Sequence, residues 1–131
     1  MKLVFFEDQR VAALMADALG IGFVPPFTTI GLERQGKLVG GCLFNNFNGY
    51  GIELTIVGPG CLSTGLFRAV SSYVFDQLGC ARMTMTAQRK NAVHVRIAER
   101  LGFKVEGIMR GHFGDDDGIV LGMLRSECRF L

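Results

Sequence analysis

Two spacings of apolar residues alternate along the chain, and they predict strands separated by helices. Short apolar runs and apolar–polar alternation predict β-strands at 3–6, 27–33, 38–47, 52–57, 82–88, 103–109 and 118–124. Apolar residues at every third or fourth position predict helices that begin near residues 8, 65 and 91. Gly20, Gly79 and Gly102 are placed to end these helices.

The order of these elements predicts a mixed sheet. The unit 52–88 reads strand, loop, helix, strand, and hairpins flank it on both sides. A strand–helix–strand unit requires parallel strands and a right-handed crossover, whereas the strands of a hairpin are antiparallel. We therefore expect an α/β (α+β) fold with a mostly antiparallel sheet, a parallel βαβ core and helices on both faces. The length of 131 residues favours one domain over 1–131.

Composition and charge exclude several classes of protein. The 18 glycines come with only 3 prolines and follow no fixed period, which excludes collagen and favours turns, helix ends or a ligand near the backbone. A formal net charge of +2 gives no reason to expect a nucleic-acid partner. Because no window approaches the roughly 18 apolar residues of a membrane span, a membrane partner is not expected either.

The cysteines and histidines do not form a metal-binding pattern. The four cysteines make no C-x-x-C pair, and His94 and His112 do not complete a ligand set, so no metal is expected. We interpret the cysteines as reduced thiols of a cytoplasmic protein. The acidic run 115–117 lacks the ligand spacing of a calcium loop, and a solvated turn is the favoured interpretation.

A glycine-rich loop separates the strand 52–57 from the next helix. It reads Gly58-Pro59-Gly60-Cys61-Leu62-Ser63-Thr64-Gly65. Small residues before a helix expose backbone N–H groups at its positive end, an arrangement that suits a phosphate. The loop matches neither the P-loop pattern nor G-x-G-x-x-G, so a tight turn with Ser63 or Thr64 as N-cap explains it equally well.

The stretch 91–107 reads N-A-V-H-V-R-I-A-E-R-L-G-F-K-V-E-G, in which Asn91 suits a helix N-cap and Gly102 a helix stop. Combined with the loop, this stretch resembles the GNAT N-acetyltransferase superfamily, most closely its ribosomal-protein N-terminal acetyltransferase branch. The resemblance covers roughly 28–125. It is carried by the hairpin 33–41, by Asn91, His94, Gly102 and Phe103 at the family's spacing, and by Glu106-Gly107-Ile108-Met109-Arg110.

The resemblance implies that acetyl-CoA (coenzyme A) is the cosubstrate. The family's pyrophosphate loop, Arg/Gln-x-x-Gly-x-Gly/Ala, aligns with 60–65, where only Gly65 fits the pattern. The end of the strand 52–57 is implied to pair with the pantetheine arm. The residues expected at the cofactor are Ile56, Val57, Gly60, Leu62, Ser63, Thr64, Gly65, Asn91 and Arg96, and Arg68, Arg89 and Lys90 are further candidates for the CoA phosphates.

Direct attack of an amine on a thioester requires a base for the amine proton, and often an acid for the leaving thiolate. Glu53 is the candidate base, with an ordinary solvent-facing residue as the alternative. Many family members place an acidic Tyr seven residues after the Asn, where this chain has Ala98. His94 shares a helix face with Ala98 and is the candidate acid, with a half-buried structural histidine as the alternative.

The resulting hypothesis is an N-acyltransferase that moves an acetyl group from acetyl-CoA to a primary amine, on a protein, a peptide or a small molecule. In the family, the segment here at 20–27 helps to form the acceptor site, and its shortness favours an open cleft. One alternative is a non-catalytic CoA-binding or protein-interaction domain with the same fold. Another is a small structural protein without a ligand. A homodimer is compatible with the high apolar content.

Overall fold

The computed structural model describes residues 1–58 and 63–131. Its strands are β1 (Lys2–Phe5), β2 (Phe27–Arg34), β3 (Lys37–Asn45), β4 (Gly51–Val57), β5 (Arg82–Gln88), β6 (Lys104–Met109) and β7 (Gly118–Leu124). Its helices are α1 (Asp8–Leu19), α2 (Thr64–Ser71) with the π-helical turn η1 (Ser72–Gln77), α3 (Ala92–Leu101) and the 3₁₀ turn η2 (Arg125–Glu127). Every strand and helix expected from the sequence is present, with bounds that differ by a few residues.

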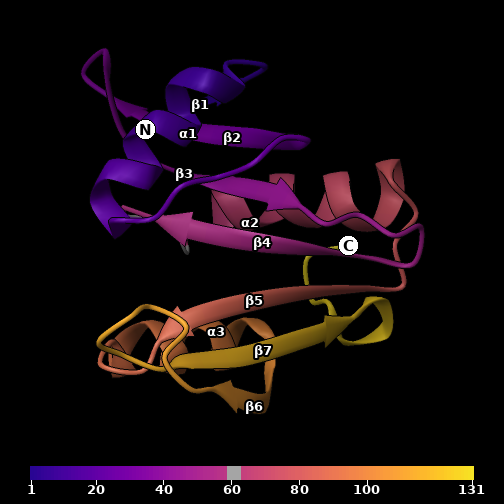
Figure 1. Cartoon of the computed structure of the whole chain (residues 1–131). Helices are drawn as coiled ribbons and strands as arrows, with labels where there is room; N and C mark the ends of the chain where they lie inside the picture. The colour runs from indigo at the N-terminus through magenta and orange to yellow at the C-terminus, as the bar shows by residue number, and fades with distance from the viewer. Residues whose placement is uncertain (59–62) are drawn as a thin grey trace.

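The strands form one sheet in the order β1-β2-β3-β4-β5-β7-β6 (Figure 1). All neighbours are antiparallel except β4 and β5, which are parallel and joined through α2. This confirms the mixed, mostly antiparallel sheet with a parallel βαβ core.

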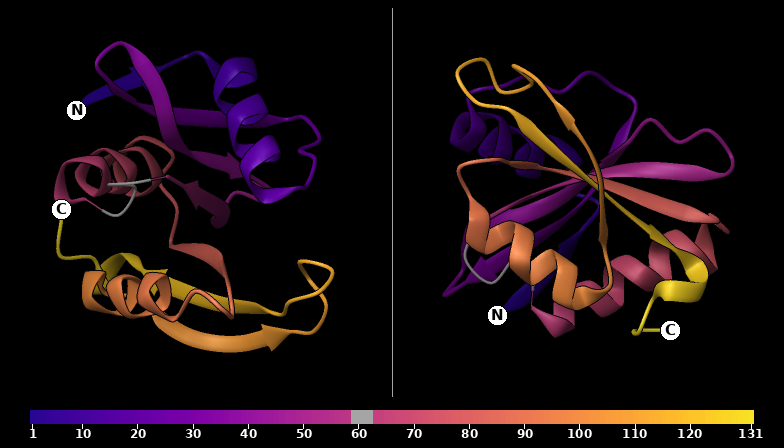
Figure 2. Two further views of the ribbon diagram at one scale, coloured as in Figure 1. Left: turned by 90° about the vertical axis from the view of Figure 1, so that its left-hand side faces the viewer. Right: turned by 90° about the horizontal axis from the view of Figure 1, so that it is seen from below.

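Helices cover both faces of the sheet, as expected. Figure 2 shows α1 on one side and α2 and α3 on the other. The larger core lies under α2 and α3, where Leu54, Met85 and Leu121 are at most 1% exposed. A smaller core lies under α1, around Val11, Met15 and Leu43. No helix in the described part of the chain is both long and apolar enough to cross a membrane.

Two glycines let α1 pack directly on the sheet. Gly31 and Gly41 are opposite each other across β2 and β3. A Cβ atom at either position would come within 2.8 or 2.7 Å of a Val11 methyl group. Because Val11 is fully buried in this gap, glycine is required on both strands.

The two halves of the sheet separate between β4 and β5. Pairing of these strands ends at Leu54 and Met85, although the strands continue to Val57 and Gln88. Over the same stretch β4 stays paired with β3, and β5 stays paired with β7. The ends of the two strands therefore diverge, as the ribbons of β4 and β5 show (Figure 1).

One departure from the expected helix lies after α2. Residues 72–77 are π-helical, with the Leu78 N–H donating to the Tyr73 carbonyl at 2.9 Å. The turn buries Val74 and Phe75 under the sheet. Apolar spacing alone did not indicate it, because one extra residue in a turn keeps the helical spacing on either side and only shifts its phase.

Candidate functional site

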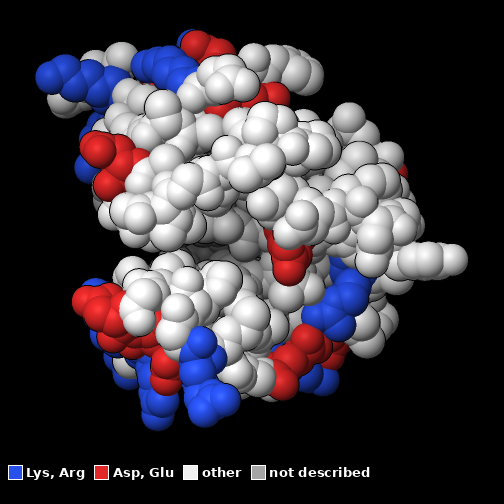
Figure 3. Space-filling model, viewed as in Figure 1, with Lys and Arg blue, Asp and Glu red and all other residues white. Residues whose placement is uncertain are grey.

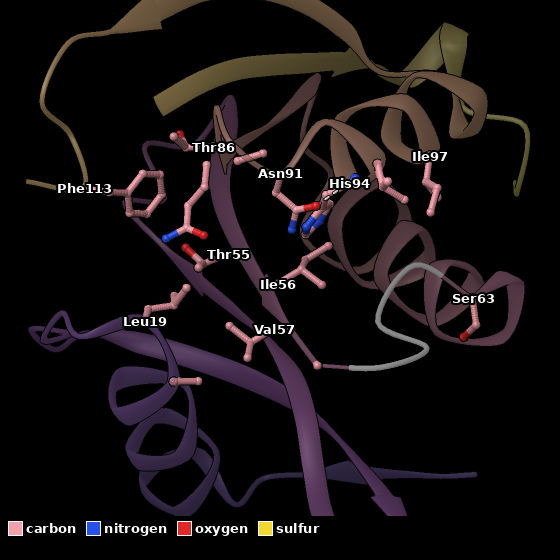
Figure 4. A pocket seen from close by; sticks show the side chains of 15 residues that line it. Leu19, Thr55, Ile56, Val57, Ser63, Thr86, Asn91, His94, Ile97 and Phe113 are labelled. Atoms are coloured by element: carbon pink, nitrogen blue, oxygen red, sulfur yellow. Dashed lines mark hydrogen bonds between the residues drawn. The ribbon is translucent and has the colours of Figure 1, made fainter. Parts of the chain in front are cut away.

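The opening between β4 and β5 is a cleft of about 650 Å³ (Figure 4). Its walls come from the ends of both strands, from the end of α1, from the N-cap of α2, from α3 and its N-cap, and from the β6–β7 loop. The lining residues are Ala18, Leu19, Thr55, Ile56, Val57, Gly58, Ser63, Thr86, Ala87, Gln88, Asn91, Val93, His94, Ile97 and Phe113. Because the cleft passes between the strands, it reaches both faces of the sheet.

On one face of the sheet, two helices begin at the cleft. Ser63 is the N-cap of α2, and its hydroxyl accepts a hydrogen bond from the Leu66 N–H at 3.4 Å. Asn91 is the N-cap of α3, and its side chain accepts from the His94 N–H at 3.2 Å. Both helix N-termini present partial positive charge to this side of the cleft, which favours an anionic group there.

His94 lies one turn into α3 and lines the same wall. Its Nε2 atom is buried and has no hydrogen-bond partner within residues 1–58 and 63–131. Burial lowers the pKa of the ring, so the neutral imidazole prevails at neutral pH. An orphaned buried nitrogen costs stability, and a ligand that offers it a partner recovers that cost.

On the other face, beside α1, the wall combines hydroxyl, amide and apolar groups. Thr55 and Thr86 lie on adjacent, diverging strands and face away from the larger core, and Gln88 follows on the same face. Leu19 closes this side from the end of α1, and Phe113 from the β6–β7 loop (Figure 4). The alternation in 82–88 already separates Thr86 and Gln88 from the buried methionines, but nothing local in the sequence marks Phe113.

Hydrogen bonds hold the loop that carries Phe113. The Asp117 carboxylate accepts from the Gly111 N–H at 2.9 Å and from the Arg89 guanidinium at 3.2 Å. The Asp116 carboxylate accepts from the Lys90 N–H at 3.0 Å. The Gly111 N–H, and after it the Arg89 guanidinium, lower the pKa of Asp117. The acidic run is a turn, as expected, but two of its carboxylates bind the chain and are not simply solvated.

The structure brings five of the residues expected at the site into the cleft lining. They are Ile56, Val57, Ser63, Asn91 and His94. Thr64 and Gly65 lie in the exposed first turn of α2, where a Cβ on Gly65 would meet nothing within 4 Å. Gly60 and Leu62 lie outside the described residues.

Glu53 and Arg96 do not line the cleft. Arg96 is exposed on α3. Glu53 is exposed on β4, on the same face as Thr55 and two residues before it, and its carboxylate accepts a hydrogen bond from the Asn46 amide. At about 3.3 Å per residue along a strand, its backbone is roughly 7 Å from that of Thr55.

The motif that begins at Glu106 serves the sheet. The Glu106 carboxylate pairs with the Arg82 guanidinium at 2.6 Å, across the strand between them. Gly122 lies beneath this pair, where a Cβ atom would collide with both side chains. The motif therefore bridges β5 and β6 at a position outside the cleft.

No protein-family model and no curated protein sequence matches the chain. Solved structures do match its fold. A mutant of the spermidine/spermine N-acetyltransferase SpeG from Vibrio cholerae superimposes with a TM-score of 0.74 and 15% identity, over 95% of both chains. A GNAT-family acetyltransferase from Bacillus anthracis gives 0.66 and 18%, again over 95% of both. A dodecameric structure of the Vibrio cholerae spermidine N-acetyltransferase gives 0.67 and 20%, over 76% of this chain and 66% of the other. The chain thus has the GNAT acetyltransferase fold, while the likeness to the ribosomal-protein branch rests on the sequence motifs.

Proposed function

We propose that the chain is an N-acyltransferase that transfers an acetyl group from acetyl-CoA to a primary amine. The observation that carries the proposal is the separation of β4 from β5, with two helix N-termini on one side of the opening and a polar floor on the other. Acetyl-CoA supplies an activated thioester; the residues of the chain bind, orient and exchange protons.

The α2–α3 side of the cleft suits the cosubstrate. Ser63 and Asn91 place helix N-termini beside it, where phosphate oxygens are favoured. The edge of β4 from Thr55 to Val57 is released from β5 and offers backbone groups to an extended amide-bearing arm. The orphaned Nε2 of His94 offers a further hydrogen bond. A backbone N–H near Val57 is, by resemblance to the family, the proposed donor to the oxyanion.

This arrangement leaves the α1 side for the amine, and Glu53 is the proposed base. Glu53 and Thr55 share this face of β4. An ammonium must lose a proton before it can attack, and the Glu53 carboxylate, on the same face of β4 as Thr55, would take that proton through bridging water. The Asn46 amide holds the carboxylate in place.

His94 is the proposed hydrogen-bond donor to the departing sulfur, and this changes the sequence hypothesis, because a neutral ring does not give up its proton to a thiolate. The thiolate would instead take up the proton that the amine nitrogen releases as the amide forms. The lowered pKa of His94 disfavours an imidazolium, so the neutral Nε2–H tautomer would make the hydrogen bond. His94 and Glu53 lie on opposite faces of the sheet. Glu53 would therefore act on the attacking amine and His94 on the departing sulfur.

A second candidate is a non-catalytic CoA-binding domain. It is favoured by Ala98, which is fully buried in the core at the position of the family's Tyr. Measuring the release of free CoA thiol with a panel of primary amines separates the two. The enzyme predicts amine-dependent release that falls at least about tenfold in Glu53→Gln and stays unchanged in Glu99→Gln, an exposed control on α3. Absence of amine-dependent release would favour the binding domain.

A further inference from the structure

The cleft carries no permanent charge in the part of the chain that the structure describes. None of its 15 lining residues is Asp, Glu, Lys or Arg. Residues 18–32, which run from the end of α1 into β2, contain no charged side chain. Figure 3, viewed from the α1 side, shows the hollow between the two halves walled mostly by uncharged atoms, with one acidic side chain at its inner end near the centre of the view and other charged groups at its outer rim.

Three carboxylates near the cleft already have partners, and two others, Asp17 and Asp115, are exposed outside its lining. Asp117 binds Gly111 and Arg89, and Asp116 binds the Lys90 N–H. Glu53 binds Asn46 and is the proposed base for the reacting amine. A second ammonium of the same acceptor, if it is held inside the cleft, therefore meets hydroxyls, an amide and apolar groups, none of which balances its charge.

The wall on the α1 side of the cleft is well matched to a neutral group. Leu19 and Phe113 offer apolar contact from opposite sides, and Thr55, Thr86 and Gln88 can donate or accept hydrogen bonds. A neutral, partly apolar group can move from water into these contacts, and no unpaired charge is buried when it does.

We infer that the acceptor is a primary amine with a single positive charge, attached to a neutral and partly apolar body, and that polyamines are poor acceptors. This inference rests on the proposed function. It separates the chain from the spermidine N-acetyltransferases that share its fold.

Matched pairs of amines test the inference. Pentylamine and 1,5-diaminopentane form one pair, alanyl-leucine amide and alanyl-lysine amide the other. For each amine, kcat/KM is measured with acetyl-CoA, and Kd is measured on the protein saturated with CoA. We expect the singly charged member to be preferred by about tenfold or more in both quantities.

Variants of the α1-side wall supply the control. Gln88→Glu and Leu19→Glu each add a carboxylate to the wall, from different elements. Because this carboxylate can bind the second ammonium, each variant should reduce the preference for the singly charged amine at least about fivefold. Gln9→Glu makes the same charge change at an exposed site on α1 outside the cleft and should leave the preference unchanged.

The two hypotheses fail in different ways. The inference is wrong if the doubly charged amines are acetylated as well as or better than the singly charged ones, or if neither wall variant changes the preference. Either result leaves the proposed acetyltransferase activity intact. If no amine is acetylated but the Kd preference and its response to the wall variants persist, the proposed enzyme is wrong and the binding selectivity stands. If Kd shows no preference, the inference is wrong whatever the turnover.

Discussion

His94 is the residue at which the fold's stability and its proposed activity conflict most directly. Its backbone N–H completes the N-cap of α3, whereas its Nε2 is buried without a partner in the described chain. If the ring served packing alone, a carbon atom could replace Nε2 with no loss of stability. Its position on the cleft wall connects it with a ligand.

Replacing His94 by Phe should therefore separate stability from activity. We expect the free energy of unfolding at pH 7.5 to stay the same or rise by about 1 kcal/mol, because an unsatisfied buried polar atom is removed. Acetyl transfer should fall at the same time. Urea unfolding and thiol release measure the two. A variant that keeps full activity rules out a role for the ring in the reaction.

The pH dependence of stability should also change at this residue. Burial lowers the pKa of His94 from its ordinary value of 6.5, so the unfolded chain binds a proton more readily than the folded protein, and the folded protein loses stability as the pH falls below about 6.5. The stability difference between the natural protein and His94→Phe should thus shift against the natural protein between pH 7.5 and pH 5. A difference that is constant over this range contradicts the lowered pKa.

Among the secondary-structure elements, α1 can pack closely on the sheet because two facing strand positions are glycines. The gap left by Gly31 and Gly41 is filled by Val11. The sequence predicted both strands and the helix, but it could not indicate that these two glycines are paired, because the register of β2 on β3 follows from the folded sheet.

Gly41→Ala should destabilise the protein by about 1–3 kcal/mol, as overpacking of a tight core does. The new methyl group would lie 2.7 Å from Val11 and 3.0 Å from the Ile30 carbonyl oxygen. Gly107→Ala, at a position in β6 with nothing within 4 Å, is the matched control. Urea unfolding measures both, and equal losses of stability would refute the packing argument.

The β6–β7 loop should depend on Asp117 and not on Asp115. Asp117→Ala removes the acceptor of the Gly111 N–H and the partner of Arg89, so amide hydrogen exchange at Gly111 should accelerate. Asp115→Ala changes the same charge at an exposed site in the same loop and should leave that exchange unchanged. Equal protection of Gly111 in the two variants means that the carboxylate does not hold the loop.

For the whole molecule, local pattern predicted the elements, the parallel unit and helices on both faces, because each depends on spacing within a few residues. The cleft was only partly predictable. Ile56, Val57, Ser63, Asn91 and His94 follow from the family-like motifs. Leu19 and Phe113 come from segments that are distant in the sequence. Only the folded sheet brings these two segments to the same cleft. The Glu106 motif carries part of the family resemblance, and its ion pair bridges strands outside the cleft.

Equilibrium binding of acetyl-CoA tests the central claim most directly, since the cleft, the helix N-termini and His94 are all assigned to it. Thermal unfolding is followed as acetyl-CoA is added. The account predicts that stability grows with ligand as mass action requires, by about 2.7 kcal/mol at a hundredfold excess over Kd. It also predicts a weaker response in Asn91→Ala, measured relative to that variant's own unliganded stability. A melting temperature that does not move at millimolar acetyl-CoA would contradict it.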